Sequence, residues 1–294
     1  MTPPDILVRI AERRRQRIDG PLTPLTPLSH PLPSAGRGGN GEEAHSPEGR
    51  GRPSPGGWEG MGEGTGVRGP ADNPFLAALR GKDPAVIAEV KMGSPRLGSL
   101  HGRFDPVKQA QLYAQNGAAA LSVVVEPDFF HGDYELLTLC REASGLPAIA
   151  KDFVVDPVQL AWAAQAGADA VLLIAAMHEA EELAGYARMA RGLGLVPLIE
   201  THDAGDVAKL LGEPWEIVGV NNRDLRTFEV DLQHSIALVP SLPPGALRVA
   251  ESGIRDALDL LMLRENGFDA FLIGESLLLA PDPGAKLREL TGRP

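Results

Sequence analysis

Six proton-exchanging or amide side chains stand at the ends of short apolar runs, where one fold could bring them together. They are Lys91, Glu126, Lys151, Glu200, Asn221 and Glu251. Lysine and glutamate are side chains that give protons to a substrate or take them from it, and an asparagine amide can orient a hydroxyl or a carbonyl group. The pattern predicts acid–base chemistry at a single site that all six side chains reach.

The spacing of two of these residues gives a further constraint. Glu89 precedes Lys91 by two residues, so both side chains leave their strand on the same face. Lys151 ends another apolar run, and partial burial beside a second cation is expected to lower its pKa and suit it to proton transfer. A structural ion pair is the alternative for Glu89 and Lys91, and Glu200 and Glu251 taken singly also have structural alternatives.

Two Gly/Ser pairs point to a phosphate. Ser252–Gly253 and the run Gly274–Glu275–Ser276 follow the seventh and eighth apolar runs. In many barrel enzymes the backbone N–H groups after the last two strands bind a phosphate. Glu275 would repel a phosphate if its side chain faced inward, so we expect only its backbone N–H to face the ligand.

The elements that would position these residues repeat along the chain. Apolar runs at 85–91, 120–125, 147–151, 170–174, 196–200, 217–220, 248–250 and 270–273 predict eight strands. Amphipathic stretches of helical length separate them, and similar Gly-containing joints recur at 116–118, 166–169 and 266–269. The pattern predicts the α/β class and a closed (β/α)₈ TIM barrel, in which catalytic groups lie at the carboxyl ends of the strands. An open doubly wound sheet is the structural alternative.

The chain divides into three parts. Residues 1–19 contain an amphipathic helix at 5–18, expected to be an N-terminal extension of the barrel. Residues 20–70 hold 14 glycines and 9 prolines, which predicts a disordered insertion, because so little apolar surface cannot offset the entropy of ordering. Residues 71–294 form the predicted catalytic barrel. We expect deletion of Pro21–Gly69 to leave activity largely intact.

Composition excludes several classes of function. A net charge of −11 argues against binding to nucleic acid or to an anionic membrane, since both need basic surface. No apolar run is long enough to span a membrane. The single cysteine, Cys140, is expected to be a core thiol in a reducing cytoplasm, and no Cys/His ligand set predicts a metal. The Arg13–Arg15 run is interpreted as a solvated helix face.

Several motifs together resemble one enzyme family. The segments IAEVKMGSP, AIAKDFVVDP, LIETH, VGVNNRDL, VAESGI and FLIGESLL occur in this order and closely resemble those of the indole-3-glycerol phosphate synthases, over about residues 73–291. The resemblance implies a cytoplasmic TIM-barrel lyase that closes, decarboxylates and dehydrates 1-(2-carboxyphenylamino)-1-deoxyribulose 5-phosphate during tryptophan biosynthesis. It implies no cofactor, because the iminium formed by ring attack is itself the electron sink.

The resemblance also implies roles for matching residues. Lys151 matches the general acid, Glu200 the base of the dehydration, and Lys91 the residue that binds the carboxylate and joins in proton transfer. Glu89, Asn221 and Glu251 match residues that orient these groups and the sugar hydroxyls. The phosphate site is matched by Ser94, Ser252, Gly253, Gly274 and the backbone at Glu275, and the aromatic ring would pack against Phe130 and Phe153. The split of duties among the two lysines and Glu200 stays open.

One of the departures from the family lies in a loop of the site. After Lys91 it reads MGSPRLGSL, where the family commonly has a second basic residue and SPSKG. Two other functions stay open: a catalytically inactive phosphate-binding barrel that acts as a scaffold, and a phosphoribosylanthranilate isomerase, whose Cys/Asp pair these strand ends lack. The expected partner is the phosphorylated substrate, and other tryptophan-pathway enzymes are left open as partners.

Overall fold

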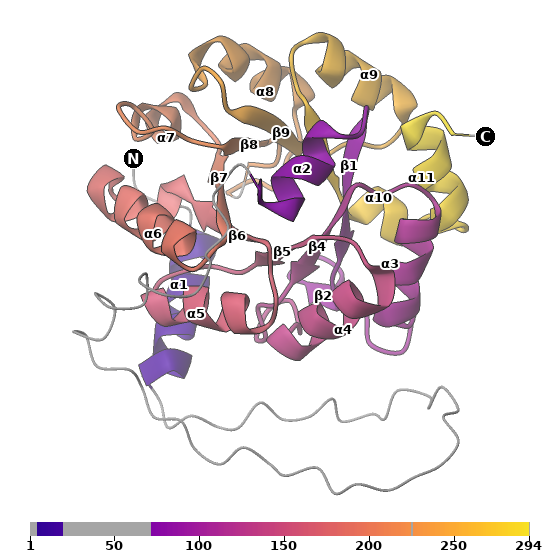
Figure 1. Ribbon diagram of the computed structural model, residues 1–294, viewed down its shortest axis with the longest axis horizontal. Coiled ribbons are helices and arrows are strands. Elements are labelled where there is room, and N and C mark those ends of the chain that lie inside the picture. The colour runs from indigo at the N-terminus through magenta and orange to yellow at the C-terminus, as the bar shows by residue number, and fades with distance from the viewer. Residues whose placement is uncertain (1–4, 20–71, 225, 294) are drawn as a thin grey trace, which may run out of the picture.

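The parallel strands of this protein close into one barrel (Figure 1). The computed structural model describes residues 5–19, 72–224 and 226–293. Its barrel strands are β1 (Ala85–Val90), β4 (Ala120–Val124), β5 (Ala148–Lys151), β6 (Ala170–Ile174), β7 (Val196–Thr201), β8 (Ile217–Asn221), β9 (Leu247–Glu251) and β10 (Ala270–Ile273). Each strand pairs in parallel with its neighbours in chain order, and β10 closes on β1. The TIM-barrel prediction is confirmed, and the open-sheet alternative is wrong.

Side chains alternate between the two faces of each strand, and this alternation separates two apolar cores. In β1, Ala85 and Ile87 belong to the cluster inside the barrel, whereas Val86 and Ala88 belong to the layer between strands and helices. Successive side chains of a strand point to opposite faces, so Glu89 shares the inward face of Ala85 and Ile87. The apolar interior therefore ends in a charged layer at the carboxyl end.

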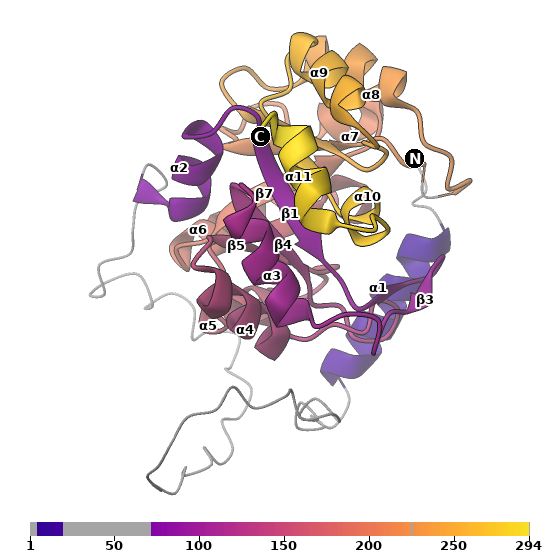
Figure 2. The same cartoon turned by 90° about the vertical axis from the view of Figure 1, so that its right-hand side faces the viewer.

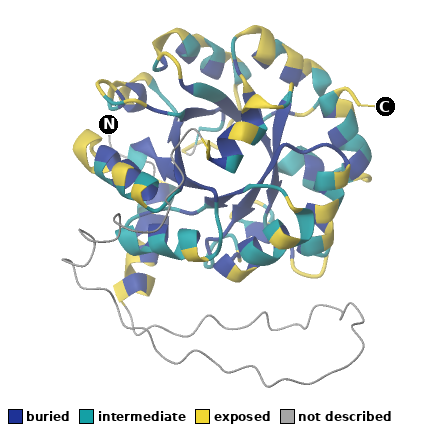
Figure 3. Ribbon diagram, viewed as in Figure 1, coloured by how far each residue is buried: buried dark blue, intermediate teal, exposed yellow. Residues whose placement is uncertain are grey.

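A ring of helices covers the outside of the barrel (Figure 3). The helices are α3 (Pro106–Gln115), α4 (Tyr134–Ser144), α5 (Pro157–Gln165), α6 (Ala180–Gly192), α7 (Ala204–Ala208), α8 (Leu232–Leu238), α9 (Ala257–Glu265) and α11 (Pro283–Thr291), with a short α10 (Glu275–Leu278) after β10. Aspartate side chains cap most of them, for example Asp105 for α3 and Asp256 for α9. A capping aspartate accepts hydrogen bonds from the first free N–H groups, which fixes where each helix begins.

Two further helices lie at opposite ends of the barrel (Figure 2). In front of α2 (Pro74–Arg80), the side chain of Asn73 donates to the carbonyls of Asp169 and Gly194, which precede β6 and β7. In contrast, α1 (Asp5–Asp19) is paired with Asp128 and Asp152, which follow β4 and β5. Thus α2 lies at the amino ends of the strands and α1 at their carboxyl ends.

The loop after β1 holds a short hairpin that the sequence did not predict, formed by β2 (Gly93–Ser94) and β3 (Gly98–Ser99). The predicted disorder of residues 20–70 lies outside the described residues. Within the described ranges, no helix is both long and apolar enough to cross a bilayer.

Candidate active site

A cavity of about 740 Å³ opens at the carboxyl ends of the strands. Twelve of the thirteen predicted site residues line it: Glu89, Lys91, Ser94, Phe130, Lys151, Phe153, Glu200, Asn221, Ser252, Gly253, Gly274 and Glu275. The thirteenth, Glu251, is fully buried beside them. The fold therefore brings together residues that are up to 186 positions apart in the chain, from Glu89 to Glu275.

Two lysines share one carboxylate at the floor of this cavity. Lys91 Nζ lies 2.7 Å from Glu89 Oε1, and Lys151 Nζ lies 3.4 Å from Glu89 Oε2. Lys151 Nζ also lies 3.4 Å from Glu251 Oε2. Lys151 is thus held between two buried carboxylates, which fixes the direction of its ammonium group.

The charges around Lys151 act against the expectation that its pKa is lowered. Burial lowers its pKa, but the carboxylates of Glu89, Glu251 and Glu200 outweigh burial and raise it above the usual value. Burial likewise opposes ionisation of Glu89, but Lys91 and Lys151 prevail and lower the pKa of Glu89 to about 2. The predicted lowering is wrong because it counted the second lysine and not the carboxylates. The neighbouring carboxylates therefore favour the ammonium form of Lys151.

The pKa of Glu251 shifts in the direction opposite to that of Glu89. Burial and the nearby charge of Glu200 raise the pKa of Glu251 above its usual range, although Lys151 opposes this. Space for Glu251 comes from Gly219, where an added Cβ would lie 2.1 Å from Glu251 Oε1. Gly219 is a residue of the site that sequence reasoning missed.

Glu200 and Asn221 form a second polar pair. Asn221 Nδ2 donates to Glu200 Oε1 over 3.2 Å, and Asn221 Oδ1 accepts the backbone N–H of Arg223. His202 Nδ1 donates to the carbonyl of Asn221 over 2.9 Å. These contacts fix the amide so that it holds the Glu200 carboxylate at the cavity wall.

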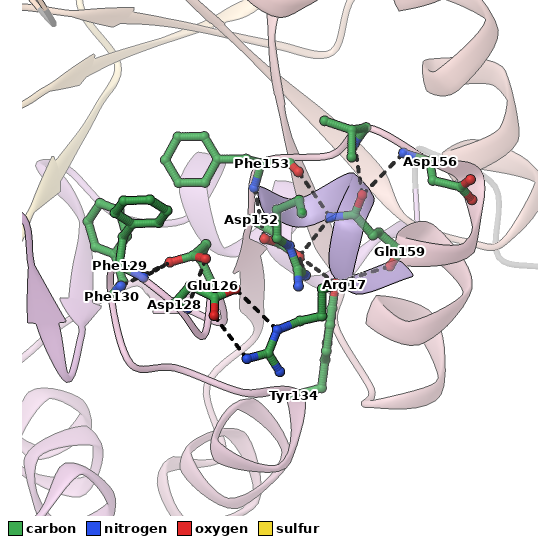
Figure 4. Close-up of polar contacts among 12 residues, drawn as sticks. Arg17, Glu126, Asp128, Phe129, Phe130, Tyr134, Asp152, Phe153, Asp156 and Gln159 are labelled. Atoms are coloured by element: carbon green, nitrogen blue, oxygen red, sulfur yellow. Dashed lines mark hydrogen bonds and ion pairs between the residues drawn. The ribbon is translucent and has the colours of Figure 1, made fainter. Parts of the chain in front are cut away.

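Glu126 does not join the site, contrary to its position at a strand end. Its carboxylate accepts the backbone N–H groups of Asp128, Phe129 and Phe130 at 3.0, 2.7 and 2.9 Å (Figure 4). A buried carboxylate needs such donors, and the tight loop after β4 supplies them. The expectation that Glu126 shares the mouth is wrong, and its role is to shape the loop that carries Phe130.

Phe130 and Phe153 lie next to each other in the wall of the cavity. Their ring centroids are 5.8 Å apart, with an angle of 33° between the planes. The two rings come from the loops after β4 and β5 and give this side of the cavity an aromatic surface.

Asp152, next to Lys151, anchors the N-terminal helix. It is ion-paired with Arg14 of α1 and accepts hydrogen bonds from Tyr134 Oη at 2.9 Å and Gln159 Nε2 at 3.0 Å (Figure 4). Arg14 is only 2% exposed, so the interpretation of Arg13–Arg15 as a solvated face is wrong at its middle residue. The sequence signal was available, since Arg14 shares the apolar helix face of Leu7, Ile10 and Ile18.

The loops after β9 and β10 form the opposite side of the cavity. Ser252 and Gly253 both have left-handed backbone, with φ of 65° and 82°. An added Cβ on Gly274 would lie 2.4 Å from Glu89 Oε1, so that loop passes close above the charged floor. Arg96 and Arg223 also line this side and are paired with Glu275. Sequence reasoning missed both arginines as site residues.

In the part of the chain that the structure describes, no group of three or more His, Cys, Asp or Glu side chains has the geometry to hold a metal ion. The carboxylates on the cavity floor are directed at lysines.

Comparisons with known proteins agree on one family. The family model described as indole-3-glycerol phosphate synthase matches residues 67–290. An indole-3-glycerol phosphate synthase of Azoarcus sp. (strain BH72) is 45% identical over 229 residues, covering 76% of this chain and 87% of the relative. Another, of Albidiferax ferrireducens, is 44% identical over 220 residues, covering 74% and 83%.

A solved structure supports the fold alone. The 3-hexulose-6-phosphate synthase from Salmonella typhimurium matches with a TM-score of 0.57 and 13% identity, covering 71% of this chain and 97% of that one.

Proposed function

Because the chain belongs to the indole-3-glycerol phosphate synthase family, we propose that its cavity performs the reaction of that family. The substrate is 1-(2-carboxyphenylamino)-1-deoxyribulose 5-phosphate, and the products are indole-3-glycerol phosphate, carbon dioxide and water. The enzyme is a carboxy-lyase of tryptophan biosynthesis. One observation carries the proposal: Lys151, held between Glu89 and Glu251 on the floor of the cavity.

Ring closure needs an acid. The ring carbon that bears the carboxylate attacks the ketone carbon, and the electron pair of the C=O bond moves to oxygen. Lys151 gives that oxygen a proton. An alkoxide is more basic than an amine, so this transfer is favourable even from a lysine whose pKa neighbouring carboxylates raise. Glu89 and Glu251 hold the ammonium group in place. Their negative charges also offset the positive charge of the iminium that ring attack forms.

Decarboxylation needs charge compensation. Lys91, paired with Glu89 at 2.7 Å, binds the substrate carboxylate while the ring is formed. Loss of carbon dioxide sends the electron pair of the broken C–C bond to the iminium nitrogen, which becomes an amine. The aromatic pair of Phe130 and Phe153 packs against the benzene ring and keeps water away.

Dehydration needs a base. Glu200, oriented by Asn221, takes the proton from the carbon next to nitrogen in the new five-membered ring. The adjacent hydroxyl leaves as water with a proton from a lysine. The ammonium group of Lys151 offsets the negative charges of Glu251, which lies 3.4 Å away, and of Glu200.

The phosphate of the substrate binds at the side formed by the loops after β9 and β10, through Ser94, Ser252, Gly253, Gly274 and the backbone N–H of Glu275. This places the sugar phosphate and the aromatic ring on opposite sides of the two lysines. The proposal places the enzyme in the cytoplasm, with other enzymes of the pathway as candidate partners.

The test is the growth of indole fluorescence after mixing purified protein with this substrate, without metal or cofactor. We expect growth from the wild type and a loss of several orders of magnitude in kcat for Lys151→Ala. The matched control is Lys108→Ala, which removes an exposed lysine of α3 and should turn over like the wild type. A folded wild type that binds the substrate without turnover would favour the inactive-scaffold alternative. Near-normal turnover by Lys151→Ala would overturn the acid assignment.

A further inference from the structure

A cluster of three charged side chains crosses the cavity at the phosphate side. The two carboxylate oxygens of Glu275 take different partners: Oε1 is paired with Arg96 and Oε2 lies 3.4 Å from Arg223 Nη2. Glu275 is the first residue of α10, Arg96 lies in the turn between β2 and β3, and Arg223 lies in the loop after β8. We call Arg96, Arg223 and Glu275 the arginine–glutamate cluster.

This cluster lies where the phosphate is proposed to bind. All three of its members line the cavity, together with Ser252, Gly253 and Gly274. The side chains are partly open to solvent, 47% for Arg96, 20% for Arg223 and 34% for Glu275. They can therefore exchange partners without breaking a packed core.

The charges of the cluster do not cancel. Two guanidinium groups face one carboxylate, which leaves one positive charge in excess. A phosphate ester carries about −1.5 to −2 charges at neutral pH and has three acceptor oxygens. It can take both guanidinium groups in charge-assisted pairs, which are stronger than neutral hydrogen bonds. Glu275 offers only one negative charge to the same donors.

We propose that the cluster is an exchangeable phosphate clamp: Glu275 pairs with Arg96 and Arg223 before the substrate binds, and the phosphate of the substrate then replaces Glu275 as their partner. Arg96 is then a specificity residue, which favours the phosphorylated substrate over one without phosphate. Glu275 is its built-in competitor, and it weakens the binding of anions that reach only the guanidinium groups, such as free inorganic phosphate. This inference rests on the phosphate end assigned in the proposed function.

Inorganic phosphate is a probe that needs no turnover. Its Kd can be taken from the rise in melting temperature with phosphate concentration, against chloride at equal ionic strength. We expect Arg96→Gln to weaken phosphate binding about ten- to a hundredfold, the range for loss of a charged hydrogen bond. We expect Glu275→Gln to tighten it, and to do so less when Arg96→Gln is also present, because the two residues share one contact.

The matched control is Arg103→Gln, which removes an exposed arginine from the same loop outside the cavity lining and should leave the Kd unchanged. With the full substrate, Arg96→Gln should raise KM and change kcat little, because the clamp is remote from the lysines. Unchanged phosphate binding in Arg96→Gln, or an equal loss in Arg103→Gln, overturns the inference. The expected phosphate series in an enzyme that shows no turnover would support the clamp and contradict the proposed function.

Discussion

At the scale of single residues, the site depends on a series of contacts between two lysines and two carboxylates. Glu89 contacts both Lys91 and Lys151, and Lys151 also contacts Glu251. The two carboxylates are buried and the two lysines partly buried, and buried charges persist only when they are paired. Removing Glu89 therefore changes the surroundings of both lysines.

The low pKa of Glu89 makes a prediction about acid stability. Its folded-state pKa of about 2 lies below the usual 4.5, so its ionisation stabilises the fold above pH 4.5 and that stability is lost as pH falls through 2. In Glu89→Gln this contribution is absent. We expect the difference in free energy of unfolding between wild type and variant to shrink as pH falls from 4.5 to 2. A difference that is constant over this range, measured by denaturant titration, would contradict the assignment.

Gly219 predicts a second outcome at this scale. An added Cβ would lie 2.1 Å from Glu251 Oε1 and 3.0 Å from Leu198 Cδ2, so Gly219→Ala must displace the Glu251 carboxylate. Overpacking of this kind costs about 1–3 kcal/mol, and we expect kcat to fall as well, because Glu251 holds Lys151.

The matched control for this change is Gly185→Ala in α6, where an added Cβ meets no atom within 4 Å. It should be neutral or more stable by up to about 1 kcal/mol, because alanine favours the helix. Denaturation and activity assays on both variants test the pair. Equal stability and activity of Gly219→Ala and wild type would show that Glu251 has room to move.

At the scale of elements, the helix α1 is attached to the loops that carry the site. Arg17 forms two hydrogen bonds with Asp128, at 3.1 and 3.0 Å, and Arg14 is ion-paired with Asp152. Asp128 lies in the loop that Glu126 shapes, and Asp152 adjoins Lys151. The helix thus contacts both loops that supply the aromatic pair, which links an N-terminal element to the cavity floor.

The buried pair predicts the effect of undocking α1. Arg14→Ala leaves Asp152 buried without its cation, a change that typically costs about 3–5 kcal/mol. We expect a lower melting temperature. We also expect a reduced kcat, because Asp152 would no longer be held by Arg14 and the backbone of the adjacent Lys151 would become less well fixed. Arg9→Ala, on the exposed face of the same helix, is the control and should change neither property. If Arg14→Ala and Arg9→Ala have the same melting temperature and kcat, the docking of α1 does not contribute to catalysis.

At the scale of the whole molecule, the placement of α1 and α2 revises the expectation for deletion of Pro21–Gly69. These helices lie at opposite ends of the barrel (Figure 2). The deletion leaves four residues, Gly20 and Pro70–Asp72, between Asp19 and Asn73. Five peptide steps span at most about 18 Å, about the length of one barrel strand, and the chain must also pass around the outer helices. We therefore expect the deletion to undock α1.

Two deletions of different length test this geometry. Removal of Pro21–Gly69 should lower the melting temperature and kcat in the same direction as Arg14→Ala. Removal of Gly36–Gly69 leaves 19 residues, which reach about 60 Å when extended, and should preserve both properties. Full activity of the longer deletion would restore the original expectation, and loss of activity in the shorter one would assign a role to residues 36–69 themselves.

The sequence by itself determined the fold class, the order of elements and most of the site. Alternating apolar runs and helical stretches define a βα unit locally, and eight such units admit few arrangements, so β6 and β10 were predicted to the residue. Residues at strand ends were found because parallel strands in a barrel all end at one mouth. The resemblance to the family added proposed roles for Lys151, Glu200 and the phosphate loops.

Only the tertiary structure decided where charges meet. Which carboxylate faces which lysine depends on the stagger of neighbouring strands, and no local pattern records it, so the direction of the Lys151 pKa shift was predicted wrongly. The same holds for Glu126, whose partners are backbone N–H groups of its own loop, and for Arg14, whose partner lies 138 residues away. The electrostatic energy of two charges depends on the distance between them. For residues far apart in the chain, that distance is set only by the complete fold.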